Sequence, residues 1–138
     1  MEKNNVLFRY LSMAFPHGVK ISKFIENPEI VTYISEPHLI KALHFDYVTI
    51  EDEPFEDGLP DIDIWSLDEI KPYLRPMESM TEKEREWYYL YGIENKSCAA
   101  SCAWLMIDWL LENHFDFLGL IPKGLAIEIN EENNPYKR

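Results

Sequence analysis

The segment Cys98–Asn113 constrains the fold more than any other part of the chain. Its apolar residues fall on nearly every side of a helix, and Ser97 is placed to cap the start of that helix. Contact between apolar side chains and water is unfavourable, so a helix of this kind needs other elements to cover it. We therefore predict that this helix lies in the core. Its apolar residues are Ala99, Ala100, Ala103, Trp104, Leu105, Met106, Ile107, Trp109, Leu110 and Leu111.

Three β-rich runs before this helix and one after it indicate a sheet. Asn-Pro and Glu-Pro-His breaks separate the first three runs. In the third run, Leu43–Ile50, successive residues face opposite sides, as expected of a half-buried strand. The preceding segment, Pro37–Leu43, is also compatible with a short helical turn. The other runs are Val19–Ile25, Glu29–Ile34 and Leu125–Ile129.

Capping residues place the shorter helices. Asn5 is a candidate cap for a first helix that extends to Phe15 and stops at the following Pro-His-Gly. Ser66–Glu69 and Thr81–Glu84 are capping boxes, which begin helices because the two side chains bond each other's backbone N–H groups. We expect a short helix at the first box and a helix through Tyr91 at the second.

The order of these elements predicts an α+β fold, with a small, mainly antiparallel sheet packed on the buried Cys98–Asn113 helix and shorter helices around it. With 138 residues, of which 46% are hydrophobic, we expect a single domain over 1–138. Pro72 and Pro76 fix their own φ angles, so Ile70–Met77 is predicted to be a stiff connector. The polar tail Asn130–Arg138 is predicted to be frayed.

The charge of the chain is strongly negative and unevenly placed. Thirteen basic and 25 acidic residues give a net charge of −12, which argues against direct contact with nucleic-acid backbones or anionic membranes. Between Ala42 and Ile70 there is no Lys or Arg, and Pro54, Gly58 and Pro60 predict a loop in the middle of this stretch. Its ten carboxylates are Asp46, Glu51, Asp52, Glu53, Glu56, Asp57, Asp61, Asp63, Asp68 and Glu69.

The sequence favours a soluble, cytoplasmic protein. Arg9 interrupts the candidate signal-peptide run, and the longest apolar stretch, Cys98–Ile107, is too short to span a membrane. Cys98 and Cys102 are four residues apart, which on a helix is a poor geometry for a disulfide, so reduced thiols are expected.

Three segments in this order carry a resemblance. They are Phe15–Lys20 (FPHGVK), Ile70–Met77 (IKPYLRPM) and His114–Ile127 (HFDFLGLIPKGLAI). Together they resemble a group of small uncharacterised proteins of Bacteroidetes genomes, often found in prophage or mobile-element neighbourhoods. The resemblance implies a bacterial or phage origin and, because the group has no established activity, no catalytic residues.

Four residues near the last predicted helix are candidates for chemistry. His114 and Asp116 are candidates for an acid–base pair, and the alternative is a histidine that interacts with the helix end. Cys98, Cys102 and His114 are candidate zinc ligands, although their spacing fits no usual zinc motif. We favour the structural reading of both sets. No chemistry is assigned to the other three histidines, His17, His38 and His44.

Two further groups are candidate sites. Asp57, Asp61 and Asp63 carry oxygen ligands of the type that Ca²⁺ prefers, but the order of the residues is not that of a calcium loop and we favour a solvated acidic loop. Trp87 and Tyr88 belong to an aromatic cluster that covers several faces of one helix, so part of it must pack and part is available for contacts.

The sequence lacks the motifs of phosphate loops, nucleophile elbows and zinc peptidases. We therefore hypothesise a non-catalytic accessory protein that binds another protein, with no cofactor and with a homo-oligomer left open. The alternatives are an acidic decoy that imitates DNA and a small enzyme that uses His114 and Asp116. The residues expected to make the interaction are Glu51, Asp52, Glu53, Glu56, Asp57, Asp61, Asp63, Trp87 and Tyr88.

Overall fold

The computed structural model describes residues 2–25, 33–52, 54–89 and 100–136. Among these residues, five strands follow the first helices without a helix between them, and the sheet that forms has all but one of its strand pairs antiparallel. The predicted α+β class is therefore confirmed. The helices are α1 (Glu2–Ala14), η1 (Phe15–His17), η2 (Leu67–Glu69), η3 (Met77–Ser79), α2 (Glu82–Tyr88) and α3 (Ala100–Glu112), and the strands are β1 (Lys20–Ile25), β2 (Tyr33–Ile34), β3 (His38–Leu43), β4 (Tyr47–Asp52), β5 (Asp61–Ser66), β6 (Ile70–Leu74) and β7 (Ile127–Glu128).

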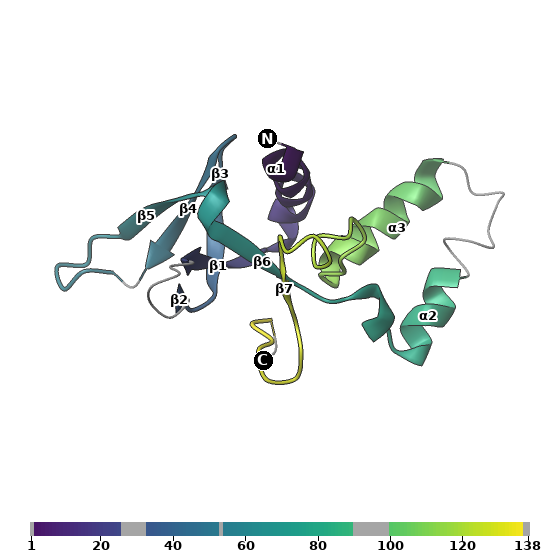
Figure 1. Ribbon diagram of the computed structural model, residues 1–138. Helices are drawn as coiled ribbons and strands as arrows, with labels where there is room; N and C mark the ends of the chain where they lie inside the picture. Colours follow the sequence, from purple (N-terminus) through teal and green to yellow (C-terminus); the bar gives the residue numbers. More distant parts are fainter. Residues whose placement is uncertain (1, 26–32, 53, 90–99, 137–138) are drawn as a thin grey trace.

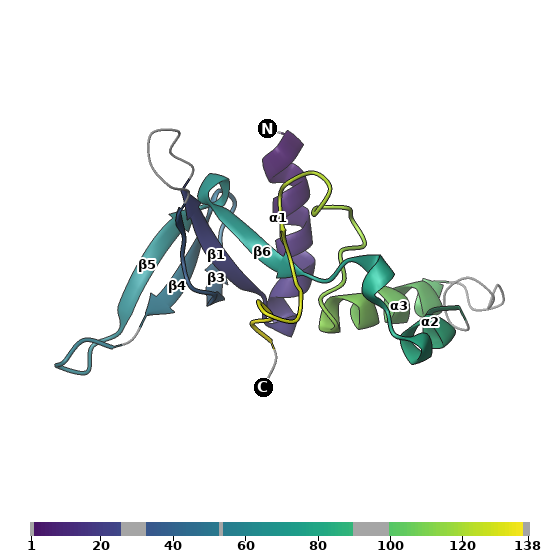
Figure 2. The same cartoon turned by 60° about the horizontal axis from the view of Figure 1, so that its bottom comes forward.

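The strands follow the order β5–β4–β3–β1–β6–β7, and β2 pairs with β1 off this path. β1 is the antiparallel neighbour of β2, β3 and β6, whereas β6 and β7 run parallel. In both views, α1 lies between the β4–β5 hairpin at one end of the molecule and α2 with α3 at the other (Figure 1, Figure 2). The sheet therefore ends in the hairpin on the side away from α2 and α3.

The main core joins α1 to the sheet. The apolar residues of α1 recur at helical spacing and lie on one side of it, where they are covered by the sheet and by the chain before β7. Burial of this stripe stabilises the fold in proportion to the apolar area removed from water. Its members include Leu7, Tyr10, Leu11 and Ala14 from α1 and Ile21, Ile40, Val48, Ile50, Trp65, Ile70 and Leu74 from the sheet.

The helix α3 is not the buried centre that its sequence predicts. Met106, Leu110 and Leu111 are buried, but Trp104 and Leu105 are 70% and 58% exposed. The reason is that α1 already covers the sheet, so the described part of α3 is packed on one side only, against α1 and α2. Among the described residues, no helix combines the length and the apolar character needed to cross a membrane.

The first part of the segment predicted as a stiff connector, Ile70–Leu74, is the strand β6, and the segment ends at Met77 where η3 begins. β6 pairs with β1 along Ile70–Pro72 and with β7 only from Tyr73 onward. Pro72 has no N–H to donate, but it precedes the β7 pairing, so no bond to β7 is lost there. The segment Pro37–Leu43 is also extended, because β3 pairs with β1 and β4, and the helical alternative is wrong.

The tail is docked as far as it is described. The Tyr136 hydroxyl accepts the backbone N–H of Lys20 at 2.9 Å and donates to the Tyr73 carbonyl at 3.2 Å. The Tyr136 ring is stacked on His114, with ring centroids 3.5 Å apart. The prediction of a frayed tail is therefore wrong up to Tyr136, because one aromatic residue provides both ring contact and hydrogen bonds.

Candidate functional site

The acidic stretch forms a hairpin that projects from the end of the sheet (Figure 1). Six residue pairs join β4 to β5, from Tyr47 with Ser66 to Asp52 with Asp61. The predicted loop lies between the two strands, where Gly58 has a φ of +85° that an L side chain rarely adopts. The Asp57 carboxylate accepts the N–H of Leu59 at 3.0 Å within this turn. The turn thus uses Asp57 as a local cap.

The two faces of the hairpin differ in burial. Successive residues of a strand point to opposite faces. The face that carries Val48 and Trp65, here called the inner face, continues into the main core. The other face, here called the outer face, carries Ile62 and Ile64, which are 59% and 66% exposed. Large apolar side chains on this outer face are therefore in contact with water.

The carboxylates are divided between the two faces. Asp52, Asp61 and Asp63 lie on the inner face beyond its buried part, and their oxygens lie within 4.8 Å of one another. Glu51 pairs with Ile62 and lies on the outer face. His38 Nε2 is 2.8 Å from Asp52 Oδ1. A hydrogen bond with Asp52 is the main cause that raises the pKa of Asp63, and desolvation and the negative charge of Asp52 add to it.

The carboxylates that gather here are not the set weighed from the sequence as calcium ligands, for which a solvated acidic loop was the favoured interpretation. Asp61 and Asp63 come together with Asp52, whereas Asp57 is engaged in the turn with Leu59. The hollow beside them has a volume of about 500 Å³ and is also lined by Lys23. Exposed or half-exposed carboxylates commonly gather in proteins without binding a metal, so this cluster alone does not assign one.

The free side of β5 is a second feature of the hairpin. β5 is the last strand in the sheet order and pairs with β4 alone among the described strands. Its six residues, Asp61–Ser66, therefore present the backbone N–H and C=O groups of one edge to the surroundings. Proteins usually blunt such an edge with charges, and here two Asp residues alternate with two Ile residues.

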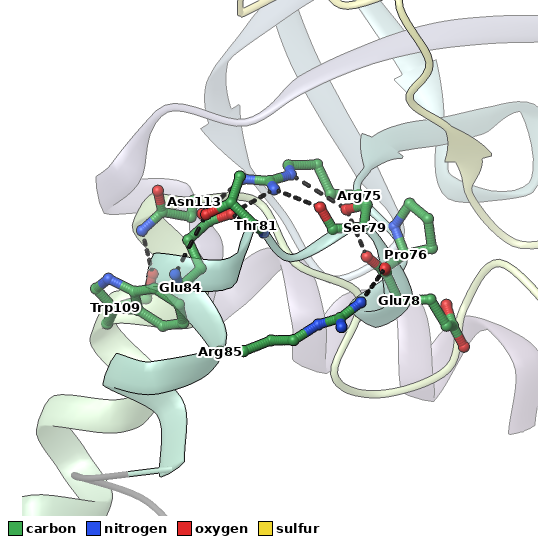
Figure 3. A network of polar contacts seen from close by, with 9 residues as sticks. All are labelled: Arg75, Pro76, Glu78, Ser79, Thr81, Glu84, Arg85, Trp109 and Asn113. Carbon is green, nitrogen blue, oxygen red and sulfur yellow. Dashed lines mark hydrogen bonds and ion pairs between the residues drawn. The ribbon is translucent and has the colours of Figure 1, made fainter.

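At the opposite end of the molecule, polar contacts hold α2 against the chain after β6 (Figure 3). Both terminal nitrogens of Arg75 donate to the Glu84 carboxylate, at 2.9 and 3.0 Å. Thr81 and Glu84 form the predicted capping box, with each side chain accepting the other residue's N–H. Arg75 is the main cause that lowers the pKa of Glu84. The charges of Arg75 and Glu84 therefore pair with each other within the fold.

The aromatic residues of α2 are used in the same way. The Trp87 ring is stacked on Trp109 of α3, with centroids 4.4 Å apart, and Tyr88 packs against the same cluster. Both residues are half-buried, whereas the neighbouring Tyr89 is exposed. Trp87 and Tyr88 therefore belong to a packing contact, and α2, which carries both, lies at the end of the molecule away from the hairpin (Figure 2).

His114 closes the end of α3. The N–H of Phe115 donates to the Leu110 carbonyl and that of His114 donates to the Leu111 carbonyl, which is the Schellman pattern. His114 occupies the left-handed position of this motif, with a φ of +61°, where glycine is usual. Burial is the main cause that lowers the pKa of His114 to about 4. This histidine is therefore neutral near pH 7.

Asp116 is committed to the backbone. Its side chain is buried, and its two oxygens accept the N–H groups of Leu120 and Ile121 at 2.7 and 2.8 Å. The His114 ring is stacked on Tyr136. Each member of the predicted acid–base pair thus has a structural role of its own, and this agrees with the structural reading of His114.

The zinc hypothesis and one interaction residue fall partly outside the described chain. Cys98 lies outside the described residues, and Cys102 lies within α3. The third candidate, His114, has its ring against Tyr136. Glu53 also lies outside the described residues. The zinc candidate, which the sequence disfavours, is therefore not tested by the described residues, and the role of Glu53 stays a prediction.

A cavity that was not expected lies between α1 and α3. It has a volume of about 430 Å³ and mainly apolar walls, which include Met13, Ile107 and Leu111. At its edge, His17 Nε2 is 2.9 Å from Asp108 Oδ1. An apolar group bound here would lie beside a paired imidazole, but among the described residues no nucleophile is hydrogen-bonded to His17. His17 and Asp108 are 91 positions apart in sequence, so only the fold brings them together.

No protein-family model, curated protein or solved structure matches this chain. Function is therefore inferred from the geometry of the chain itself.

Proposed function

We propose that the protein is a non-catalytic binding protein and that its partner, another protein, docks on the β4–β5 hairpin. One observation carries the proposal: four large apolar side chains on or near the hairpin tip and outer face are more than half exposed. Exposed apolar side chains that gather on one surface and are rimmed by polar groups mark interaction sites more often than isolated ones do. The four residues are Phe55, Leu59, Ile62 and Ile64.

The charge of the hairpin defines the chemistry of the partner. Glu51 lies beside Ile62 on the outer face, and Glu56 and Asp57 are exposed at the tip. Opposite charges across an interface speed association and select the partner, whereas apolar contacts supply much of the affinity. The surface therefore favours a partner with basic residues around an apolar patch. We further propose a cytoplasmic bacterial setting and a prophage or mobile-element origin, both of which rest on the sequence.

The two alternative functions receive less support from the geometry. A DNA mimic needs its carboxylates in a continuous stripe, but Glu51 and Asp52 lie on opposite faces of the hairpin. An enzyme that uses His114 and Asp116 needs a free base, but the Asp116 oxygens accept two backbone N–H groups. Protein binding is therefore the function that the geometry supports best.

The test uses variants of matched exposure. Ile62→Ser with Ile64→Ser removes the apolar outer face, and Leu105→Ser removes a side chain of similar exposure, 58%, from α3 at the other end of the molecule. Proteins captured from a Bacteroidetes lysate by the unmodified chain are purified, and the dissociation constant of each variant is measured. We expect the hairpin variant to bind at least roughly tenfold more weakly and Leu105→Ser to bind normally. Equal binding by the hairpin variant and the unmodified chain would contradict the proposal.

A further inference from the structure

We infer that the free edge of β5 accepts a basic, extended segment of the partner as an added β-strand, an inference that rests on the proposed function. An extended segment that joins a sheet edge gains backbone hydrogen bonds, which supply affinity, while its alternate side chains supply specificity. β5 meets the backbone requirement, because it is the terminal strand of the sheet order and pairs with β4 alone among the described strands.

The side chains of β5 specify the pattern of the added strand. Asp61 and Asp63 point to the inner face, whereas Ile62 and Ile64 point to the outer face. Neighbouring strands place side chains of the same face about 5 Å apart, where opposite charges and apolar pairs both stabilise the sheet. The added strand is therefore expected to alternate Lys or Arg on the inner face with Val, Ile or Leu on the outer face.

The charge of the edge disfavours a second copy of this chain as the occupant. Antiparallel pairing of two β5 strands keeps the inner faces on the same side, so Asp61 and Asp63 of both copies would gather there. These residues already lie within 4.8 Å of Asp52, and each copy has a net charge of −12. A basic segment removes this repulsion, whereas a second copy increases it.

Recognition by backbone pairing requires an accessible strand edge and does not require a pocket. The hairpin projects beyond the rest of the sheet in both views, so a straight segment can reach β5 (Figure 1, Figure 2). The strand has six residues, a length that roughly 20 Å of extended partner would cover. The recognised element is therefore expected to be a short linear segment.

A synthetic peptide of about eight residues that alternates lysine and valine serves as the probe. Its fluorescein label reports binding by anisotropy, and a glutamate–valine peptide is the charge control. Two further forms carry N-methyl groups, one on every lysine and the other on every valine. Each form blocks the hydrogen bonds of one edge of the peptide only, because successive N–H groups of a strand point to opposite edges.

Strand addition predicts that exactly one N-methylated form loses roughly tenfold or more in affinity. The glutamate–valine peptide is expected not to bind, Asp61→Asn with Asp63→Asn to bind the lysine–valine peptide more weakly, and Leu105→Ser to bind it normally. Equal binding of both N-methylated forms would overturn strand addition, as would failure of the unmodified peptide to bind. A dimer of the free protein that Ile64→Lys dissociates would overturn it too, by assigning the edge to a second copy.

The experiments distinguish a failure of strand addition from a failure of the proposed function. If both N-methylated forms bind but Ile62→Ser with Ile64→Ser does not, the hairpin binds through its outer face and only the strand addition is wrong. If the purified partner binds the hairpin variant normally, the hairpin is not the binding surface and the proposed function is wrong. Circular dichroism of each variant verifies that the fold is retained.

Discussion

The two ends of the molecule contain the same kinds of residue and use them differently. At the end formed by α2 and α3, Arg75 neutralises Glu84 and Trp87 is stacked on Trp109. At the end formed by the hairpin, Ile62 and Ile64 are exposed on a terminal strand of the sheet order, whereas the exposed Trp104 and Leu105 at the other end lie on a helix. Exposed apolar side chains therefore indicate a binding surface most clearly where a free strand edge lies beside them, as it does on β5.

The chain of contacts at the α2–α3 end is continuous. The Arg75 guanidinium lies 4.2 Å above the Phe115 ring, and the Phe115 ring contacts Trp109 with a centroid distance of 5.5 Å. Phe115 is fully buried. Charge and aromatic contacts thus converge on one residue, which we expect to contribute strongly to stability.

The largest expected difference between the two ends is in unfolding free energy. Phe115→Ala removes a fully buried ring and is expected to cost about 3–5 kcal/mol. Ile62→Ser and Ile64→Ser remove exposed side chains and are each expected to cost about 0.5 kcal/mol or less. Urea unfolding followed by fluorescence measures both. Similar losses at the two ends would mean that the hairpin face is part of the core.

A smaller difference in unfolding free energy is expected when one glutamate at each end is replaced by glutamine. Glu84→Gln keeps a side chain that can complete the capping box but removes the charge that Arg75 faces, at a cost of about 1–2 kcal/mol. Glu56→Gln is the control, because Glu56 is exposed in the hairpin turn, and it is expected to have no measurable effect. A loss at Glu56 that equals the loss at Glu84 would remove the contrast between the two ends.

Local caps at the two ends provide a finer comparison. The Thr81 hydroxyl accepts the N–H of Glu84 at the start of α2, so Thr81→Ala is expected to cost about 1 kcal/mol. Asp57→Ala removes a cap in an exposed turn and is expected to cost only a few tenths of a kcal/mol. Thermal unfolding measures both losses, and Thr81→Ala is expected to lose more stability than Asp57→Ala. A larger loss for Asp57→Ala would contradict this expectation.

The smallest expected effect concerns how the unfolding free energy depends on pH. His114 and Asp63 are expected to change it in opposite directions. The folded pKa of His114, about 4, lies below its unfolded value of 6.5, so its contribution to stability is lost as pH falls from 6.5 to 4. The folded pKa of Asp63 is raised above 3.8, so its contribution is present in acid and lost as pH rises through the folded pKa. Urea unfolding from pH 4 to 7 should show a smaller acid loss for His114→Asn and a larger one for Asp63→Asn, and the opposite order would contradict these assignments.

Local signals in the sequence were sufficient for some elements. The capping box at Thr81 and the strand β1 were predicted correctly, because hydrogen bonds within four residues and a run of β-branched and aromatic residues determine them. The exposure of α3 was not predicted, because composition shows which side chains are apolar but not which neighbours cover them. Trp104 and Leu105 carry the same signal as the buried Leu110 and Leu111.

The candidate site was predictable only in part. The carboxylates of the hairpin were found from charge alone, but the strand β5 was not, although Asp-Ile-Asp-Ile-Trp in Asp61–Ser66 alternates with the period of a strand. The pairing of His17 with Asp108 and the gathering of Asp52 with Asp63 depend on contacts between distant segments. No local pattern contains that information.

Amide hydrogen exchange of residues 61–66, measured with and without the lysine–valine peptide, tests the account most directly. An added strand engages the free backbone N–H groups of β5, so these amides are expected to exchange more slowly in the complex, while those of α3 are unchanged. Binding of the peptide with no slowing in residues 61–66 would contradict the assignment of this edge as the docking site.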